Sequence, residues 1–370
     1  MDVIAPPTSL KFLARLRMDE LLALLRARGF RVKGPRLADG AIVYDDIKTS
    51  KELPAGISVY QEAGQYLVAH SETTRWFAWA NGPQALKPLL FQARETLWRV
   101  QRDEHGKLAF ESVLPQVQPL AVVGVRACDI AALHLQDQHF LRQSFPDVHY
   151  ARRREQLALI ALNCTHPAVT CFCASTDDGP AATFGFDWAM TELDHGFIVN
   201  AGSARGTEWV NALQLDDASS NDIQLAQAQV DAAARNQTRS LPRQQRAQRL
   251  LAVMEHPQWD DVAERCLSCG NCTSVCPTCF CSNVAAQTHT SLETSSQVRE
   301  WDSCFTAQHS SMHGTVVRAD TRLRYRQWLI HKLATWETQY GRSGCVGCGR
   351  CINWCPVGID LTVECTKLLS

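Results

Sequence analysis

Two short segments of the 370-residue chain repeat one spacing of cysteines. They are CLSCGNCTSVCP at residues 266–277 and CVGCGRCINWCP at residues 345–356, and both follow the pattern C-x2-C-x2-C-x3-C-P. This is the bacterial ferredoxin spacing, in which thiolates hold the irons of a cubane cluster. Zinc is the alternative, because C-x2-C pairs also bind it, but zinc sites separate two such pairs by a longer insert. The segments therefore predict two [4Fe-4S] clusters.

The fourth cysteine of each segment is expected to serve the cluster of the other segment. The first three cysteines can wrap one compact turn around a cluster, whereas the cysteine before the proline leaves that turn. In two-cluster ferredoxins this last cysteine binds the second cluster. The predicted ligands are Cys266, Cys269, Cys272 and Cys355 for cluster 1, and Cys345, Cys348, Cys351 and Cys276 for cluster 2.

Four further cysteines follow two apolar runs that are typical of buried strands. LAVVGV at residues 120–125 leads into Cys128, and LALIALN at residues 157–163 leads into Cys164, with Cys171 and Cys173 in the next loop. If these strands are parallel neighbours, both carboxyl ends meet at one edge of the sheet, where open α/β sheets place their sites. The four thiols predict a third [4Fe-4S] cluster. A zinc site and unliganded buried thiols are the open alternatives.

The remaining cysteines carry weaker signals. The chain has 16 cysteines, all from residue 128 onward, and such clustering in a large chain favours metal binding over a disulfide framework. Cys279, Cys281 and Cys304 are expected to pack near a cluster, and whether any of them is a ligand stays open. Cys365 is expected to have no role in metal binding.

Composition excludes several function classes. Lys and Arg number 37 against 38 Asp and Glu, so the net charge of −1 gives no support to a nucleic-acid partner. No apolar run approaches the roughly 18 residues that a membrane span needs, and the N-terminus lacks the order of a signal peptide. We therefore expect a cytoplasmic protein without a membrane span. No G-x-G-x-x-G, P-loop or G-x-S-x-G motif occurs, so no catalytic substrate site is expected on this chain.

The elements that must position these cysteines fall into two parts. Leucine spacing predicts a helix over residues 10–28, and short apolar runs predict strands at residues 41–47, 57–60, 65–70 and 197–200. Beyond residue 222 the pattern is mainly helical, with no strand-like alternation after a polar linker at residues 236–245. The predicted organisation is an α+β or α/β domain over residues 1–240, which holds the possible third cluster, and an α-helical dicluster ferredoxin domain over residues 241–370.

With these motifs in place, the chain resembles the iron–sulfur beta subunits of soluble NAD(P)-linked [NiFe] hydrogenases, or sulfhydrogenases, a group that includes the related iron–sulfur subunit of anaerobic sulfite reductases. Ala127 stands where the family usually has proline, and this departure removes no ligand. The first 120 residues match only loosely. The matching segments are VVGVRACDIAAL (122–133), NCTHPAVTCFCAS (163–175), CLSCGNCTSVCPTCFC (266–281), WDSCF (301–305) and CVGCGRCINWCPVGID (345–360).

The resemblance implies a relay of single electrons through the clusters. A flavin subunit would exchange hydride with NAD(P)H, and this chain would carry electrons between that flavoprotein and the small and large subunits of a [NiFe] hydrogenase. The first alternative is the same relay in an anaerobic sulfite reductase, where the partner is a sirohaem subunit. The second is a self-contained flavin iron–sulfur oxidoreductase, and the third is a scaffold with redox-inert clusters.

Overall fold

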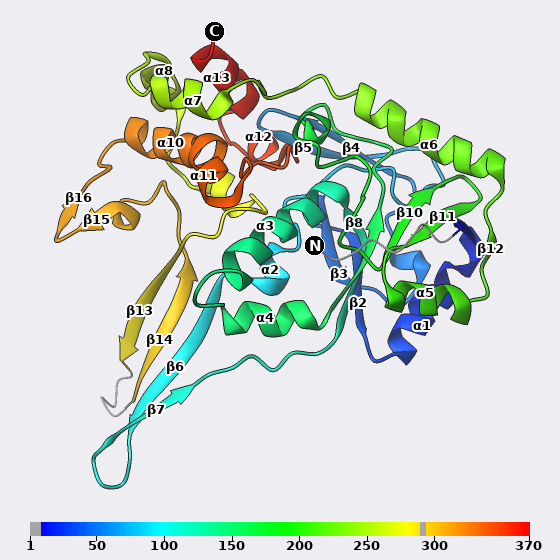
Figure 1. The fold of residues 1–370 in the computed structure, drawn as a ribbon, viewed down its shortest axis with the longest axis horizontal. Coiled ribbons are helices and arrows are strands. Elements are labelled where there is room, and N and C mark those ends of the chain that lie inside the picture. The colour runs from blue at the N-terminus through cyan, green and yellow to red at the C-terminus, as the bar shows by residue number, and fades with distance from the viewer. Residues whose placement is uncertain (1–8, 289–293) are drawn as a thin grey trace.

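The largest element of the fold is a mixed sheet of eight strands, seen in a computed structural model that describes residues 9–288 and 294–370 (Figure 1). Neighbours β10, β9, β8 and β2 run parallel, and the other pairs are antiparallel. In spatial order the strands are β12 (Asp216–Asp217), β1 (Lys11–Ala14), β11 (Gly196–Ala201), β10 (Trp188–Glu192), β9 (Leu157–Leu162), β8 (Leu120–Arg126), β2 (Arg31–Ala38) and β3 (Ala41–Asp46).

Helices cover both faces of this sheet. Alternate side chains of β8 and β9 point to opposite faces, so one set packs with α1 (Met18–Ala27) and α5 (Ala204–Ala212), and the other packs with α3 (Ala127–Leu141) and α4 (Val148–Glu155). Every residue of β9 is buried, which explains its continuous apolar run. The predicted parallel pairing of residues 120–125 with 157–163 is confirmed.

The helix predicted over residues 10–28 is partly wrong. Residues Lys11–Ala14 form strand β1, Arg15–Arg17 a turn of 3-10 helix, and the α-helix begins only at Met18. The strand forms because β11 and β12 pair with it on its two sides. This long-range pairing overrides the local leucine spacing. The strands predicted near residues 41–47, 57–60, 65–70 and 197–200 are confirmed as β3, β4 (Ile57–Glu62), β5 (Gln65–His70) and β11.

The part after residue 240 is mostly helical, but the prediction that it has no strands is wrong. Strands β13 (Ser282–Thr288) and β14 (Thr294–Trp301) pair with each other, and β14 also pairs with β6 (Arg94–Arg102). All of β13 is exposed, so its sequence carries no apolar alternation. The helices here are α7 (Arg246–Ala252), α8 (Gln258–Arg265), α9 (Asn271–Ser274), α10 (Thr321–Ile330), α11 (Trp336–Tyr340), α12 (Arg350–Asn353) and α13 (Leu361–Leu368), with a π-helical turn at His331–Thr335 between α10 and α11.

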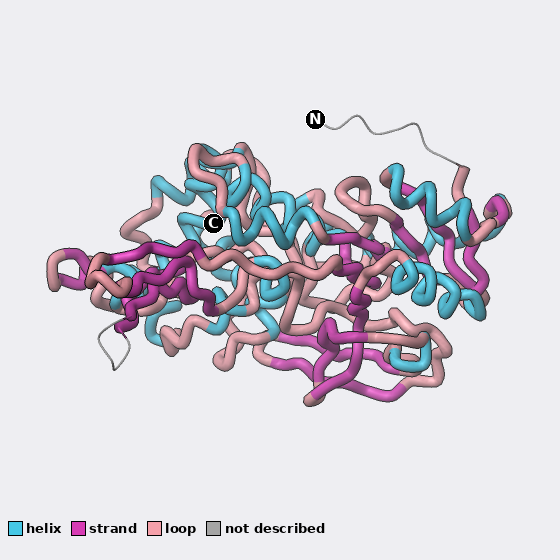
Figure 2. Tube along the Cα trace, turned by 90° about the horizontal axis from the view of Figure 1, so that it is seen from below, coloured by secondary structure: helices cyan, strands magenta, loops and turns pink. Residues whose placement is uncertain are grey.

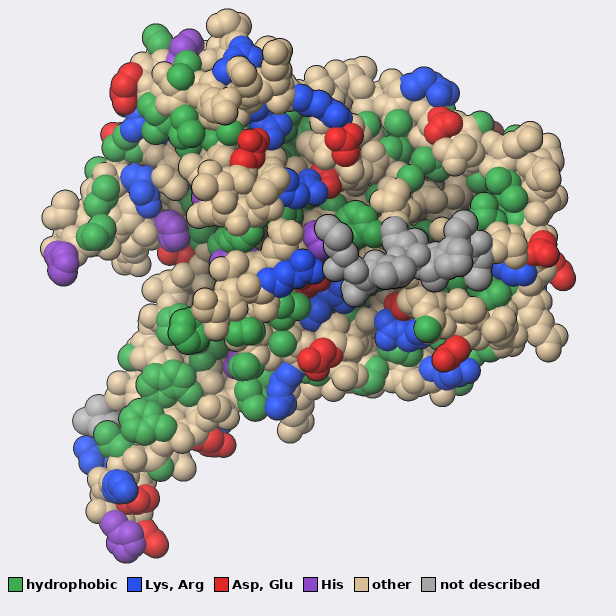
Figure 3. Space-filling model, viewed as in Figure 1, with side chains coloured by type: hydrophobic (Ala, Val, Ile, Leu, Met, Phe, Trp, Pro, Cys, Tyr) green, Lys and Arg blue, Asp and Glu red, His purple; other side chains and the backbone are tan. Residues whose placement is uncertain are grey.

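Strands β6, β7 (Leu108–Ser112), β13 and β14 form an arm that projects from the molecule, at the opposite end from β12 (Figures 1 and 2). Hydrophobic side chains gather on its surface (Figure 3), and the exposed apolar residues of these strands include Trp98, Phe110 and Val284. The arm joins strands from both sides of residue 240. The division of the chain into domains at that residue stays a prediction.

The remaining elements are short or lie at the periphery. They are the helices α2 (Lys87–Leu90) and α6 (Ser220–Arg235), the strands β15 (Ser311–Met312) and β16 (Thr315–Val316), and the 3-10 turns Ser50–Glu52, Cys173–Thr176 and Gln308–Ser310.

None of the helices in the described ranges has the length and apolar character needed to cross a bilayer.

Candidate metal centre

Three cavities in the structure are each lined by four cysteines, and they correspond to the three sets that the sequence predicts. Whether the cysteines bind iron stays a prediction. Cavity 1 has Cys266, Cys269, Cys272 and Cys355, cavity 2 has Cys276, Cys345, Cys348 and Cys351, and cavity 3 has Cys128, Cys164, Cys171 and Cys173.

Cavity 1 lies between the first motif and helix α10. Cys266 follows the end of α8, and Gly270 (φ +73°) turns the chain so that α9 brings Cys272 inward. Tyr325 and Trp328 of α10 also line the cavity. Their buried hydroxyl and Nε1 groups have no hydrogen-bond partner among the described residues. Cluster sulfurs accept hydrogen bonds, so these donors fit a [4Fe-4S] group.

A buried lysine supports the first motif from outside cavity 1. Lys87 of α2 is 4% exposed, and its Nζ donates to the carbonyl oxygens of Thr273 (3.1 Å) and Ser274 (2.9 Å). It also lies 4.1 Å from the ring centroid of Trp301. Burial lowers the pKa of Lys87. The two hydrogen bonds from Lys87 join the short helix α9 to the N-terminal part of the chain.

Cavity 2 contains a buried cation. Lys332 is 4% exposed, and its Nζ lies 3.4 Å from Cys276 Sγ while donating to Thr278 Oγ1 at 2.9 Å. Burial alone would lower the pKa of Lys332, but charge interactions with the sulfurs of Cys276, Cys279 and Cys345 outweigh it, so the pKa lies well above its ordinary value. The ammonium therefore stays charged beside the thiols. A buried cation fits an anionic group in this cavity.

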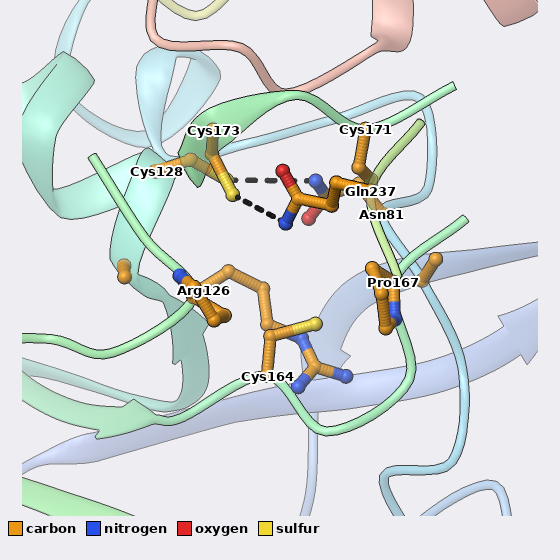
Figure 4. A pocket seen from close by; sticks show the side chains of 11 residues that line it. Asn81, Arg126, Cys128, Cys164, Pro167, Cys171, Cys173 and Gln237 are labelled. Carbon is orange, nitrogen blue, oxygen red and sulfur yellow. Dashed lines mark hydrogen bonds between the residues drawn. The ribbon is translucent and has the colours of Figure 1, made fainter. Parts of the chain in front are cut away.

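Cavity 3 lies at the carboxyl ends of β8 and β9, as the sequence predicts (Figure 4). Cys128 comes from the first turn of α3 and Cys164 from the loop after β9. Two amides donate to its sulfurs: Asn81 Nδ2 to Cys128 Sγ at 3.5 Å and Gln237 Nε2 to Cys173 Sγ at 3.3 Å. Both amides come from segments without cysteine, so no motif could indicate them.

Arg126 is the strongest sign that cavity 3 holds an anionic group. The residue lines the cavity and is 2% exposed, and its Nη2 donates to the carbonyl oxygens of Phe77 (3.0 Å) and Trp79 (2.6 Å). Its Nε and Nη1 have no partner among the described residues. Unsatisfied buried N–H groups of a guanidinium are costly. A thiolate-bound cluster at this place would accept their hydrogen bonds.

Burial sets the charge state of three thiols in cavity 3. It raises the pKa of Cys128 and Cys171 well above the ordinary range, and that of Cys173 to about 12. These cysteines are therefore protonated at neutral pH unless a metal offsets their charge. Metal binding must release their protons, which is the expected coupling for a thiolate site.

Cavities 2 and 3 are joined by direct backbone contact. Phe172 N donates to Gly347 O at 2.8 Å. A Cβ on Gly347, whose φ is +62°, would lie 2.5 Å from Cys173 N. Only glycine allows the two loops to approach this closely. Cavities 1 and 2 are neighbours as well, because each ferredoxin segment contributes three cysteines to one and its last cysteine to the other.

A buried ion pair ties the second ferredoxin segment to cavity 3. Arg350, between Cys348 and Cys351, donates from Nη1 and Nη2 to the carboxylate of Asp129 at 2.5 and 2.9 Å. The two side chains are 1% and 0% exposed. Asp129 directly follows Cys128. Sequence reasoning missed this pair because neither residue belongs to a cysteine spacing.

The remaining cysteines take different positions. Cys279 lines two further cavities, and one of these shares Lys332 with cavity 2. Cys281 and Cys304 face each other with their sulfurs 4.0 Å apart. Cys365 is fully buried in the helical core.

Comparison with known proteins supports iron–sulfur clusters in the C-terminal part of the chain. Two family models described as "4Fe-4S dicluster domain" match, one over residues 265–359 and one over residues 230–280. Sulfhydrogenase 2 subunit beta of Pyrococcus furiosus is 31% identical over 277 residues, which are 74% of this chain and 79% of that protein. No solved structure matches the chain. The family matches favour iron–sulfur clusters over zinc at the two ferredoxin segments.

Proposed function

Because the chain belongs to the family of iron–sulfur beta subunits represented by the sulfhydrogenases, we propose that it relays single electrons between a flavin subunit that binds NAD(P) and a [NiFe] hydrogenase module. The iron–sulfur clusters would supply one-electron chemistry. The chain's own residues would bind them, exclude water and adjust their potentials. The same relay toward a sirohaem subunit is the second candidate, favoured by the same family resemblance.

The observation that carries the proposal is the series of three adjacent four-cysteine cavities. Cavity 1 and cavity 2 share the two ferredoxin segments, and the loops of cavity 2 and cavity 3 touch at Gly347 and Phe172. Such adjacency suits electron transfer between successive centres. A single isolated centre would have no need of it.

The relay is tested by removing one thiol from cavity 2 in the anaerobically purified complex. Cys348→Ser should disrupt one cubane and uncouple NAD(P)H oxidation from the terminal reaction, while the partner flavoprotein keeps its NAD(P)H-dependent reduction of artificial dyes. Cys365→Ser is the matched control, because this buried thiol lines none of the three cavities. End-to-end transfer at the wild-type rate in Cys348→Ser would refute the relay.

The identity of the partners is tested by what copurifies with the tagged chain from its own host. Nickel together with a flavoprotein supports the hydrogenase assignment. A sirohaem absorption band without nickel would transfer the proposal to sulfite reduction. A chain that is isolated alone with bound flavin would instead favour a self-contained oxidoreductase.

The third cluster is tested by iron content. Three cubanes require about twelve irons per chain and two require about eight. Cys171→Ser, which removes one thiol of cavity 3, should lower the iron content by about four. A wild-type content of about eight would mean that cavity 3 holds no cubane.

A further inference from the structure

The base of the hairpin formed by β13 and β14 brings together two cysteines that the three cavities do not use. Cys281 directly precedes β13, and Cys304 lies three residues beyond β14. The pairing of Ser282 with Trp301 and the hydrogen bond from Asp302 N to Cys281 O (2.9 Å) hold the two ends of the hairpin together. The sulfurs of Cys281 and Cys304 lie 4.0 Å apart as a result.

A histidine completes this cluster of donors. One ligand atom from each of Cys281, Cys304 and His309 lies within 4.8 Å of the other two. Within the described ranges, no other three His, Cys, Asp or Glu residues bring their ligand atoms this close together. His309 lies on the 3-10 turn Gln308–Ser310, a few residues after Cys304. Cys304 is buried, and Cys281 and His309 are half-buried.

The histidine is oriented for binding by a carboxylate. His309 Nδ1 lies 2.9 Å from Asp302 Oδ2, so this nitrogen donates to the carboxylate and Nε2 is left as the acceptor. Asp302 is itself held by Ser303 N (2.7 Å) and Thr306 Oγ1 (2.5 Å) through its other oxygen. Metal-binding histidines typically donate their second ring N–H to a carboxylate in this way, which sets the tautomer and the ring orientation.

The distance between the sulfurs identifies the kind of metal group. Two thiolates at about 2.3 Å from one tetrahedral ion lie about 3.8 Å apart. The observed 4.0 Å matches this value. The ligands of a cubane bind separate irons at its corners and lie farther apart. Thiolate and imidazole together are the ligands typical of zinc.

We propose that Cys281, Cys304 and His309 bind a single zinc ion at the base of the arm, separate from the three four-cysteine cavities. We expect water in the fourth position, since Cys281 also lines a cavity of about 220 Å³ that can admit it, as does Asp302, which accepts from His309. Three protein ligands and one water form a recognised zinc arrangement. The ion would fasten the hairpin of the arm to the helical part of the chain.

The proposal is tested by measuring zinc and iron in the anaerobically purified complex. We expect about one zinc per chain, with an X-ray absorption spectrum at the zinc edge that fits two sulfur and two nitrogen or oxygen neighbours. Cys304→Ser and His309→Gln should each lower the zinc content at least tenfold and leave the iron content unchanged. Asp302→Asn, a milder change that keeps the side-chain size, should weaken retention of zinc against a chelator.

The matched control is His313→Gln, which changes an exposed histidine four residues beyond His309 and should keep the zinc. Three outcomes would overturn the proposal. One is wild-type protein without zinc, whether Cys281 and Cys304 are free thiols or joined as a disulfide. Another is zinc that survives both Cys304→Ser and His309→Gln. The third is a loss of about four irons in Cys304→Ser, which would indicate a cubane here.

Discussion

Lys332 allows a quantitative test of how this chain adjusts a cluster potential. Its amino group is buried beside cavity 2, 3.4 Å from Cys276 Sγ, and the surrounding thiolates keep its pKa well above the ordinary value. A positive charge at this place stabilises an electron added to the cluster. Lys332→Met should therefore make the reduction potential of cluster 2 more negative.

The size of the effect follows from the geometry. The added electron resides on iron, which lies roughly 2.3 Å beyond a ligating sulfur, so about 6 Å separates it from the ammonium. At an effective dielectric constant of about 20, two unit charges at that separation interact by about 2.8 kcal/mol. For a one-electron couple this energy corresponds to about 120 mV. The expected change is thus on the order of 100 mV in the negative direction.

The assay is a redox titration of the anaerobically purified complex, followed by electron paramagnetic resonance. Lys332→Arg keeps the charge and should retain most of the wild-type potential. Lys367→Met removes a half-exposed charge and should change little, because solvent screens it. If Lys332→Met has full iron content and unchanged potentials, the electrostatic reasoning is refuted.

Three further perturbations test the contacts around the cavities. Gly347→Ala should destabilise the fold by more than about 1 kcal/mol and lower iron retention, since φ is positive and the facing loop leaves no room; thermal unfolding measures this. Arg350→Met should cost about 3–5 kcal/mol, because it leaves the Asp129 carboxylate buried without its partner; its melting temperature is compared with that of the exposed Arg243→Met. If cavity 3 holds the proposed third cluster, Gln237→Ala should lower its potential at unchanged iron content, because a donor to sulfur is lost; redox titration would show it.

The grouping of the cysteines could be predicted because ligand spacing is a local property. Each ferredoxin segment fits three thiols into one turn, and the cysteine before Pro277 or Pro356 lies outside it. Cavity 3 needed one further step, the parallel pairing of β8 with β9. Their continuous apolar runs indicated buried parallel strands, and the structure pairs them.

Elements that depend on distant partners could not be predicted. Strand β1 forms within a leucine-rich stretch because β11 and β12 supply its hydrogen bonds. Strand β13 has no buried face, and its pairing with β14 alone makes it a strand. For β1 the decisive interactions join residues far apart in the sequence. The sequence of β13 has no apolar period, because the whole strand is exposed. No local pattern therefore indicates either strand.

The buried cations explain why the cavities must form together. Thiolates in a protein interior are costly unless positive charge offsets them, and the offset here comes from buried lysine and arginine side chains. Lys332 lines cavity 2 from the π-helical turn after α10, and Arg126 lines cavity 3 from the end of β8. Arg350 of the second ferredoxin segment pairs with Asp129, which follows Cys128 of cavity 3. Neither ferredoxin segment is therefore complete without the sheet and the helices around it. We expect insertion of the clusters and folding of the chain to be coupled. Metal binding requires the thiols to lose their protons, and the buried cations stabilise the resulting thiolates only when the chain is folded.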